Sequence, residues 1–392
     1  MLVPWNDSVT RPIRVAFLTR SMEVGGAEVQ LSLLARNLGS EDFDVRVFTL
    51  YSRGLLAKTL EDAGVTLVSV EKRGRWDLVG PYRRLVRRLR EYQPDILHSF
   101  LAPPNIFAAL VKPSQLGCRL VWGFRASNMD LDRYDWSHRA SETLQRRLVR
   151  RVDKIVTNSQ SGRDFAVSRG FSSDQQVVIP NGIDTEKFVP DPSSVQSLRK
   201  KWGVADDAHV VGIAARLDPM KDHGTFLRAA AIAAKQSPSL HFVCVGDGQA
   251  AYRDALHSQA SQLGLNHRLT WAGHHQNMAQ VYNALDVATL TSAFGEGFPN
   301  AVGEAMACGT PCVVTDVGDG VDIVGDASLH APVGDENALA RGWMKLIAED
   351  PEDKVDRATA CRTRIVENFS MAAMVGAHQH LYQRLAHSSV NH

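Results

Sequence analysis

The feature that most constrains the fold is a regular alternation of two kinds of segment along all 392 residues. Short runs rich in β-branched residues, such as Ile13 to Thr19, alternate with longer stretches typical of amphipathic helices. Most of the short runs are apolar at nearly every position, which is typical of parallel strands covered by helices on both faces. The order therefore predicts a doubly wound α/β fold.

The strand-like runs fall into two sets of five or six, which predicts one Rossmann-like sheet in each half of the chain. The length favours two domains as well. We place the boundary in the Pro- and Ser-containing stretch after Asp184. The expected organisation is an N-terminal Rossmann-like domain at 1–185, a C-terminal Rossmann-like domain at 186–369 and a C-terminal helix at 370–392. Whether that helix crosses back to the N-terminal domain stays open.

Charge is distributed unevenly along the chain, although the net charge of +1 argues against a nucleic-acid partner. Up to Asp184 there are 27 Lys and Arg against 20 Asp and Glu, and after it 17 against 23. A basic front half and an acidic back half suggest different partners for the two halves. Two Arg-rich runs, 83–90 and 146–151, are typical either of solvated helix faces or of contact with an anionic membrane surface.

The sequence has no segment typical of secretion or membrane insertion. Residues 1–12 lack the apolar core of a signal peptide, and no run approaches the roughly 18–20 apolar residues that cross a bilayer. The cysteines show no CxxC pair and no metal-type spacing, so we expect free thiols in a reducing compartment. The expected location is cytoplasmic, with peripheral contact at the inner membrane face as an open alternative.

Two loops at expected strand ends have features of a diphosphate site. Gly25 and Gly26 precede a strongly helical stretch, and paired glycines let backbone N–H groups approach an anion at a helix N-terminus. In the second half, Arg216 and Lys221 lie on one strand-end loop. Two such cations can neutralise the charge of a diphosphate. They can also stabilise the negative charge that grows on a diphosphate when it acts as a leaving group. The alternative for Gly25 and Gly26 is a tight turn without a ligand. The alternative for Arg216 and Lys221 is a pair of solvated side chains in ion pairs.

A third loop contains Gly246-x-Gly248-x-x-Ala251 directly after a strand-like run. This spacing has the form of the dinucleotide-binding fingerprint, which leaves a nicotinamide-dependent oxidoreductase as an alternative function. The fingerprint is expected on the first strand of its domain, whereas this run is the second of its half. We therefore interpret Gly246 as a neighbour of a phosphate or a sugar.

The most informative stretch runs from Thr291 to Asp319 and contains two acids, Glu296 and Glu304. The segment 297–300 between them predicts a loop followed by a short helix from Ala301 to Ala307, since proline suits the first helical turn. The open N–H groups of such a helix can point at a diphosphate, and ionised carboxylates can accept hydrogen bonds from sugar hydroxyls. The alternative is that the two acids only stabilise the helix through its dipole. That alternative does not explain the loop sequence between the two acids.

These motifs resemble those of the retaining family 4 glycosyltransferases, which have the GT-B fold. The resemblance is carried by FGEGFPNAVGEAMACGTPCVVTDVGD, ARLDPMKDHGTFLRA, VIPNGIDTEKF and GGAE at 25–28. It implies two Rossmann-like domains facing across a cleft, with the N-terminal domain on the acceptor side and the C-terminal domain binding the nucleotide-sugar donor. It also implies transfer of a sugar from a nucleotide-diphosphate donor, UDP-linked in preference to GDP-linked, to a glycan or lipid-linked acceptor, with retention of configuration and without a metal or cofactor.

The resemblance assigns roles to individual positions. Arg216 and Lys221 would hold the donor diphosphate. Glu304 would bind the nucleotide ribose, and Glu296 would lie against the transferred sugar. Further candidate donor contacts come from the glycine-containing loops and the segment before the short helix: Gly25, Gly26, Gly246, Gly297, Phe298, Pro299 and Asn300.

One position departs from the family pattern. Many members carry a His at the end of the strand that corresponds to RLVWGFRAS, where this chain has Arg125. This substitution leaves a catalytically impaired nucleotide-sugar-binding protein as an alternative. His98, at the end of DILHSF, is the other first-domain candidate for catalysis, and a role in capping its loop is equally consistent. Asp130-x-Asp132 has the form of a metal–nucleotide motif from another glycosyltransferase fold, and we do not expect it to bind a metal.

Overall fold

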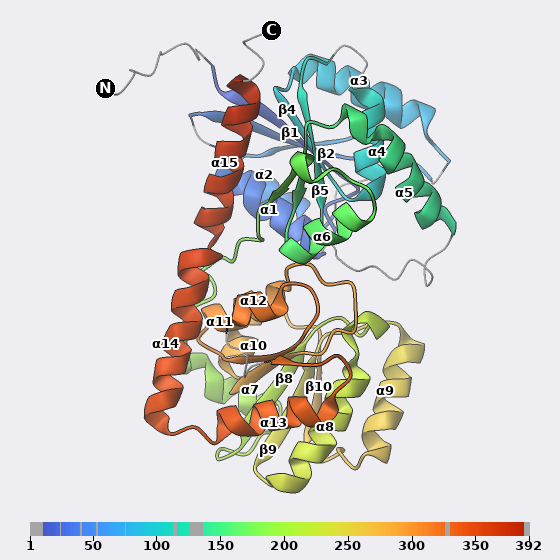
Figure 1. Ribbon diagram of the computed structural model, residues 1–392. Coiled ribbons are helices and arrows are strands. Elements are labelled where there is room, and N and C mark those ends of the chain that lie inside the picture. The colour runs from blue at the N-terminus through green and yellow to red at the C-terminus, as the bar shows by residue number, and fades with distance from the viewer. Residues whose placement is uncertain are drawn as a thin grey trace.

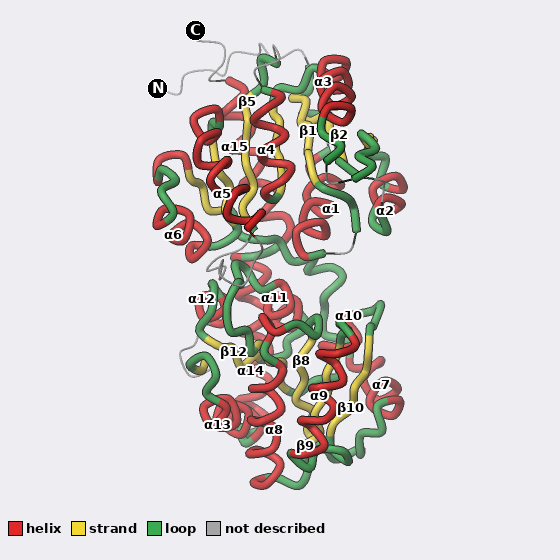
Figure 2. The backbone as a smooth tube through the Cα atoms, turned by 90° about the vertical axis from the view of Figure 1, so that its right-hand side faces the viewer, coloured by secondary structure: helices red, strands yellow, loops and turns green. Residues whose placement is uncertain are grey.

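The protein is described by a computed structural model over residues 11–23, 25–39, 41–51, 54–74, 76–112, 116–125, 136–325 and 330–387. Within these residues the chain forms two parallel sheets, one in each half, each with helices around it. The two halves lie one above the other in Figure 1. Figure 2, turned by 90°, shows the same separation, with loops at the junction of the two domains.

The first sheet has the strand order β3 (Thr66–Ser69), β2 (Phe43–Thr49), β1 (Ile13–Thr19), β4 (Ile96–Phe100), β5 (Arg119–Phe124), β6 (Lys154–Thr157) and β7 (Gln176–Val178). Its helices are α1 (Gly26–Leu38), α2 (Ala57–Asp62), α3 (Val79–Tyr92), α4 (Ala102–Val111), α5 (Trp136–Leu148) and α6 (Gln160–Ser168). The strand order moves outward from β1 on both sides, as a doubly wound sheet requires.

The second sheet has the order β10 (Leu269–Gly273), β9 (Leu240–Val245), β8 (His209–Ala214), β11 (Val287–Leu290), β12 (Cys312–Thr315) and β13 (His330–Ala331). Its helices are α7 (Val195–Lys201), α8 (His223–Gln236), α9 (Ala250–Gln262), α10 (Met278–Asn283), α11 (Asn300–Ala307), α12 (Gly320–Val324) and α13 (Glu336–Ile347). Two C-terminal helices follow, α14 (Pro351–Asn368) and α15 (Met371–His387).

Alternate residues of the buried strands face opposite layers of the protein. In β1, Val15 and Phe17 join a core cluster with residues of α1 and α15, whereas Ala16 and Leu18 join a second cluster with residues of α3 and α4. Because both faces of the strand are buried, its sequence is apolar at nearly every position. The second domain has its own core, which includes Trp343 of α13.

The predicted α/β fold is confirmed, with one difference in strand number. The sequence indicated five or six strands per half, whereas the described residues form sheets of seven and six strands. The strands that were missed are β7 and β13, which have three and two residues. Runs this short carry no recognisable periodicity, so they were not separated from the loops around them.

The C-terminal helices join the two domains, as the red ribbon in Figure 1 shows. Helix α14 packs against α11 of the second domain, while α15 packs against α1, β1 and β4 of the first. Met374, Leu381 and Tyr382 of α15 belong to the same core cluster as β1. The C-terminal helix therefore crosses back and completes the first domain.

The crossing point is held by backbone hydrogen bonds to the segment that leads from the first domain to the second. Ile183 N donates to Phe369 O at 2.8 Å, and Met371 N donates to Ile183 O at 2.8 Å. Gly182 is required here because a Cβ at this position would lie 2.8 Å from the Met371 Cα. The two connections between the domains thus run side by side.

The structure also bears on the expectations about membrane-spanning segments and about the cysteines. Among the described residues, no helix has both the length and the apolar character needed to cross a bilayer. The five cysteines all lie within the described residues and are buried without disulfide bonds. Burial raises the pKa of Cys118 to about 11, which suits an inert thiol rather than a reactive one.

Candidate active site

The loop after β8 carries Arg216 and Lys221, and Asp218 sets its shape. The Asp218 carboxylate accepts a hydrogen bond from Met220 N at 3.0 Å and so caps a short 3₁₀ turn at Pro219–Lys221. The Arg216 Nη2 lies 3.0 Å from Asp218 Oδ2. With 68% of its side chain exposed, Arg216 is oriented by this contact and is accessible to a ligand.

Lys221 and Glu296 form an ion pair that joins this loop to the loop after β11. The Lys221 ammonium contacts Glu296 Oε1, which also accepts a hydrogen bond from Ser292 Oγ at 2.5 Å. Thr291 Oγ1 donates to Lys221 O at 2.7 Å, so side chain and backbone contacts together fix the two loops. The cation and the acid, 75 positions apart in sequence, therefore form one largely buried unit.

Glu304 lies on α11 and is held by a tyrosine of α10. Its Oε2 accepts a hydrogen bond from the Tyr282 hydroxyl at 2.9 Å. Burial raises the pKa of Glu304 to about 7, although the Tyr282 hydrogen bond and the charge of Lys187 favour the ionised form. From sequence, Glu304 was expected to be an ordinary ionised acceptor, and its raised pKa follows only from the packing around it.

Helix α11 begins at Asn300, one residue before the start predicted from sequence. Pro299 is the N-cap residue and supplies no side-chain acceptor to the first turn. The Phe298 ring is buried and packs against Phe369, with ring centroids 5.4 Å apart. A ligand contact at 298 or 299 would therefore have to use the backbone, and such a contact stays a prediction.

The starts of α1 and α11 approach each other across the domain junction. A Cβ on Gly26 would lie 3.7 Å from Asn300 Nδ2, and a Cβ on Gly297 would lie 2.6 Å from Asn158 Oδ1 after β6. Glycine at 297 is therefore needed for the contact between the two domains. An anion between the two helix starts would meet two positive helix ends.

Arg125 is connected to the same junction through an asparagine. Its Nη1 donates to Asn181 Oδ1 at 3.1 Å, and Asn181 Nδ2 donates to Asn300 Oδ1 at 2.8 Å. The guanidinium lies over the Phe100 ring, with the Cζ atom 4.8 Å from the ring centroid. Burial lowers the pKa of Arg125 to about 10, so the side chain stays charged at neutral pH.

The structure contradicts a substrate contact at His98. This residue lies within β4 and is fully buried, so its ring has no surface from which to touch a sugar. Its Nδ1 lies 2.6 Å from the Tyr382 hydroxyl oxygen of α15, and its ring stacks on Phe100 with centroids 4.4 Å apart. Burial, together with His378 and Arg125, holds the pKa of His98 well below its usual range. His98 therefore supports the packing beneath Arg125.

The packing of two neighbouring loops accounts for the glycines after β9. Gly246 has a φ of 135°, and a Cβ there would lie 2.0 Å from Ala215 O. A Cβ on Gly248 would lie 2.1 Å from Leu217 O. Both glycines allow the loop after β9 to pack directly on the loop that carries Arg216. The fingerprint-like spacing thus has a structural cause, and a donor contact at Gly246 stays a prediction.

Three residues near the junction were not assigned a role from sequence. Gln30 of α1 donates from Nε2 to Gly182 O at 3.0 Å and lies 3.5 Å from Asn300 Oδ1. Asn181 was quoted within a motif but without a function. Glu28 lies so close to the start of α1 that a Cβ on Gly25 would be 2.4 Å from Glu28 Oε2, and burial raises the pKa of Glu28. The GGAE and NGID motifs contain Glu28 and Asn181 and could have indicated them, whereas neither motif contains Gln30.

The described residues contain no group of three or more His, Cys, Asp or Glu side chains arranged to hold a metal ion. The Asp130-x-Asp132 motif lies outside the described residues.

Comparison with known proteins identifies the family. A model of glycosyltransferase family 4 matches residues 24–187, and a model of the group 1 glycosyl transferases matches residues 208–349. The D-inositol 3-phosphate glycosyltransferase of Stackebrandtia nassauensis is 31% identical over 367 residues, which span 84% of this chain and 80% of that protein. The chain belongs to glycosyltransferase family 4.

Other similar proteins match over shorter spans or by structure. The UDP-Gal:alpha-D-GlcNAc-diphosphoundecaprenol alpha-1,3-galactosyltransferase of Escherichia coli is 28% identical over 211 residues, 52% of this chain and 53% of that protein. The crystal structure of Anabaena Alr3699/HepE in complex with UDP and glucose superimposes with a TM-score of 0.84 and 22% identity, covering 95% of this chain and 100% of that one. This similarity shows that the fold is GT-B. Family membership contradicts the alternative of a nicotinamide-dependent oxidoreductase.

Proposed function

We propose that this glycosyltransferase uses a nucleotide-diphosphate sugar, a UDP-sugar in preference to a GDP-sugar, and transfers the sugar with retention of configuration to a glycan or lipid-linked acceptor. The observation that carries the proposal is the Lys221–Glu296 ion pair. Its acid, Glu296, lies four residues before the start of α11. The ion pair brings a cation suited to phosphate and an acid suited to sugar hydroxyls to one point of the domain junction.

In this proposal the ion pair exchanges partners when the donor binds. A diphosphate would take Lys221 as its counter-ion, and Glu296 would then be released to accept hydrogen bonds from the sugar. Arg216, exposed on the same loop, would hold the other side of the diphosphate. A cation about 4 Å from a phosphate oxygen contributes on the order of 4 kcal/mol at an effective dielectric near 20, before desolvation is subtracted. Glu304 would bind the ribose diol.

The proposed reaction needs no base from the protein. The bond between the anomeric carbon and the diphosphate oxygen breaks, and the acceptor hydroxyl bonds to the same face of that carbon. The hydroxyl proton passes to the leaving diphosphate. The contribution of Arg216 and Lys221 is then to stabilise the charge that grows on the diphosphate, which lowers the barrier without a bound metal ion.

The preference for UDP is supported by the relatives. The Anabaena structure was determined with UDP and glucose, and the Escherichia coli relative is named for a UDP-galactose donor. Thermal stabilisation tests this preference, because a ligand that binds only the folded protein raises the melting temperature by mass action. We expect at least one UDP-sugar to raise Tm more than GDP- and ADP-sugars at the same concentration. A larger shift with a GDP-sugar would contradict the preference.

A catalytically impaired sugar-nucleotide-binding protein is the second candidate, because Arg125 replaces the family His. Its contact with Asn181, and through it with Asn300, places this cation at the junction. Release of UDP from UDP-sugars by the purified protein separates the candidates. Stabilisation by a UDP-sugar together with UDP release supports the enzyme, whereas stabilisation without release supports the second candidate.

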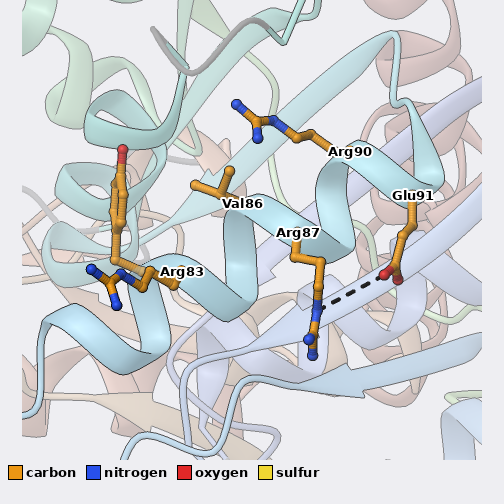
Figure 3. Close-up of a pocket in the computed structure, with 6 residues that line it drawn as sticks. Arg83, Val86, Arg87, Arg90 and Glu91 are labelled. Carbon is orange, nitrogen blue, oxygen red and sulfur yellow. Dashed lines mark ion pairs between the residues drawn. The ribbon is translucent and has the colours of Figure 1, made fainter.

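We also propose that the first domain contacts an anionic membrane surface through α3, at the inner face if the protein is cytoplasmic. Figure 3 shows Arg83, Arg87 and Arg90 projecting from this helix, with Arg87 paired to Glu91. The apolar face of α3 is already buried in the core of the domain. Exposed apolar side chains occur just before and at its start, where Trp76 is 78% and Val79 65% exposed. Arginines beside exposed apolar residues suit a lipid interface.

Vesicle flotation tests the membrane contact. The triple variant Arg83→Gln/Arg87→Gln/Arg90→Gln is expected to bind phosphatidylglycerol-containing vesicles at least about tenfold more weakly, since each arginine near an anionic surface contributes about 1 kcal/mol. The control is Lys200→Gln/Lys201→Gln, at exposed cations of α7 in the second domain. Equal binding of the triple variant and the wild type would contradict the contact. Equally strong binding of the wild type to vesicles of pure phosphatidylcholine would contradict it as well.

A further inference from the structure

Asp319 makes a contact between the domains that its own helix does not require. It is the N-cap residue of α12, where an aspartate side chain commonly accepts a hydrogen bond from its own first turn. Here the side chain makes no such bond. Its two oxygens instead accept hydrogen bonds from Gln160 N at 2.7 Å and Ser161 N at 2.9 Å, at the start of α6 in the first domain.

This contact completes the capping of α6. The Ser159 side chain accepts a hydrogen bond from Gly162 N at 3.0 Å, which leaves the preceding two amides of the first turn to find other acceptors. Asp319 supplies both acceptors from the other domain. A carboxylate on a helix N-terminus is also favoured by the helix dipole, and hydrogen bonds to an ionised acceptor are stronger than neutral ones.

Asp319 is bound equally closely to the loop that carries Glu296. Its backbone N donates to Gly297 O at 3.0 Å. Gly318 has a φ of 65°, and a Cβ there would lie 2.6 Å from Gly297 O and 2.8 Å from Glu296 O. Because these backbones are in direct contact, a shift of Asp319 relative to α6 would move Glu296 and Gly297 as well.

We propose that Asp319 is a positioning residue that clamps the Glu296–Gly297 loop against α6 and so fixes Glu296 at the domain junction during sugar transfer. The close approach of Gly297 to Asn158, next to α6, lies on the same contact surface and supports the same clamp. The role in transfer rests on the proposed function, whereas the contact itself does not.

The test compares Asp319→Asn with Asp322→Asn, which changes an exposed acid of the same helix. In Asp319→Asn, amide hydrogen exchange at Gln160 and Ser161 is expected to become at least about tenfold faster, because one acceptor oxygen is replaced by a donor. The kcat for UDP release from UDP-glucose is expected to fall at least about tenfold. The Kd for UDP should stay within about twofold, since Arg216 and Glu304 are untouched. Asp319→Glu, which keeps the charge, should recover part of the kcat.

Each remaining outcome also decides between the hypotheses. Unchanged exchange at Gln160 and Ser161 in Asp319→Asn would show that the clamp does not exist. Faster exchange with wild-type kcat would reduce Asp319 to a structural cap and overturn the positioning role. If the wild type releases neither UDP from UDP-glucose nor GDP from GDP-mannose, the proposed function fails and takes the positioning role with it, whereas the exchange rates still decide whether the clamp exists.

Discussion

At the level of single residues, Glu304 combines two opposing requirements. Binding a ribose diol needs an ionised acceptor, but burial raises the pKa of Glu304 from 4.5 to about 7. Between these two pH values the folded protein holds a proton that the unfolded chain has released. The free energy of unfolding therefore falls as pH rises through this window, and above pH 7 the folded state carries the full cost of burying the charge.

The variant Glu304→Gln should remove this cost while keeping an acceptor for the Tyr282 hydroxyl. Above pH 7 its free energy of unfolding is expected to exceed that of the wild type by about 1–3 kcal/mol, and the difference should shrink as pH falls toward 5. Urea unfolding at several pH values measures this, with Glu186→Gln, at an exposed acid, as the control. A difference that does not change with pH would contradict the assignment. UDP-sugar binding should weaken in the same variant.

At the level of single elements, local patterns predicted the strands well. The strand β1 has the bounds of its predicted run, Ile13 to Thr19, because nearly all of its residues are apolar or β-branched and the run ends at the charged Arg20. The short helix α11 was placed to within one residue by the prolines and glycines around it. These signals depend only on neighbours in sequence. The strands β7 and β13 have only three and two residues, so they are recognised by their pairing with β6 and β12 rather than by a pattern of their own, and they were missed.

The loops differ from the strands because their glycines serve contacts between elements. The backbone at Gly246 approaches Ala215 O, whereas Gly264, with a φ of 75°, has no atom within 4 Å of an added Cβ. We expect Gly246→Ala to lower the free energy of unfolding by about 3 kcal/mol or more, through clash and backbone strain together. Gly264→Ala should cost only about 1–2 kcal/mol from the backbone conformation. Chemical denaturation compares them, and equal losses would contradict the packing role of Gly246.

At the level of the whole molecule, the candidate site is built from contacts that no local pattern contains. The motifs around Arg216, Lys221, Glu296 and Glu304 were found from sequence, because their glycines, prolines and charges cluster within short segments. The pairing of Lys221 with Glu296 was not predicted from sequence, because the two residues lie on loops 75 positions apart that meet only in the folded protein.

The first domain gives a second example at this scale. The His98 contact with Tyr382 spans 284 positions and forms because α15 returns from the second domain. From sequence, His98 was expected at the end of a strand, where a contact with the sugar and a role in capping the loop were equally consistent. The helix that buries it could be predicted, but not the surface on which it docks.

The central claim is that Arg216 and Lys221 act on the diphosphate of a sugar nucleotide at the domain junction. The most direct measurement is turnover of Arg216→Ala and Lys221→Ala with the donor that gives the largest thermal stabilisation, followed as release of the nucleoside diphosphate. Each variant is expected to lose at least about 10²-fold in kcat, the scale of one lost transition-state contact, while its circular dichroism spectrum stays that of the wild type. Lys235→Ala, at an exposed cation of α8, should keep wild-type turnover. Wild-type turnover in both Arg216→Ala and Lys221→Ala would contradict the claim.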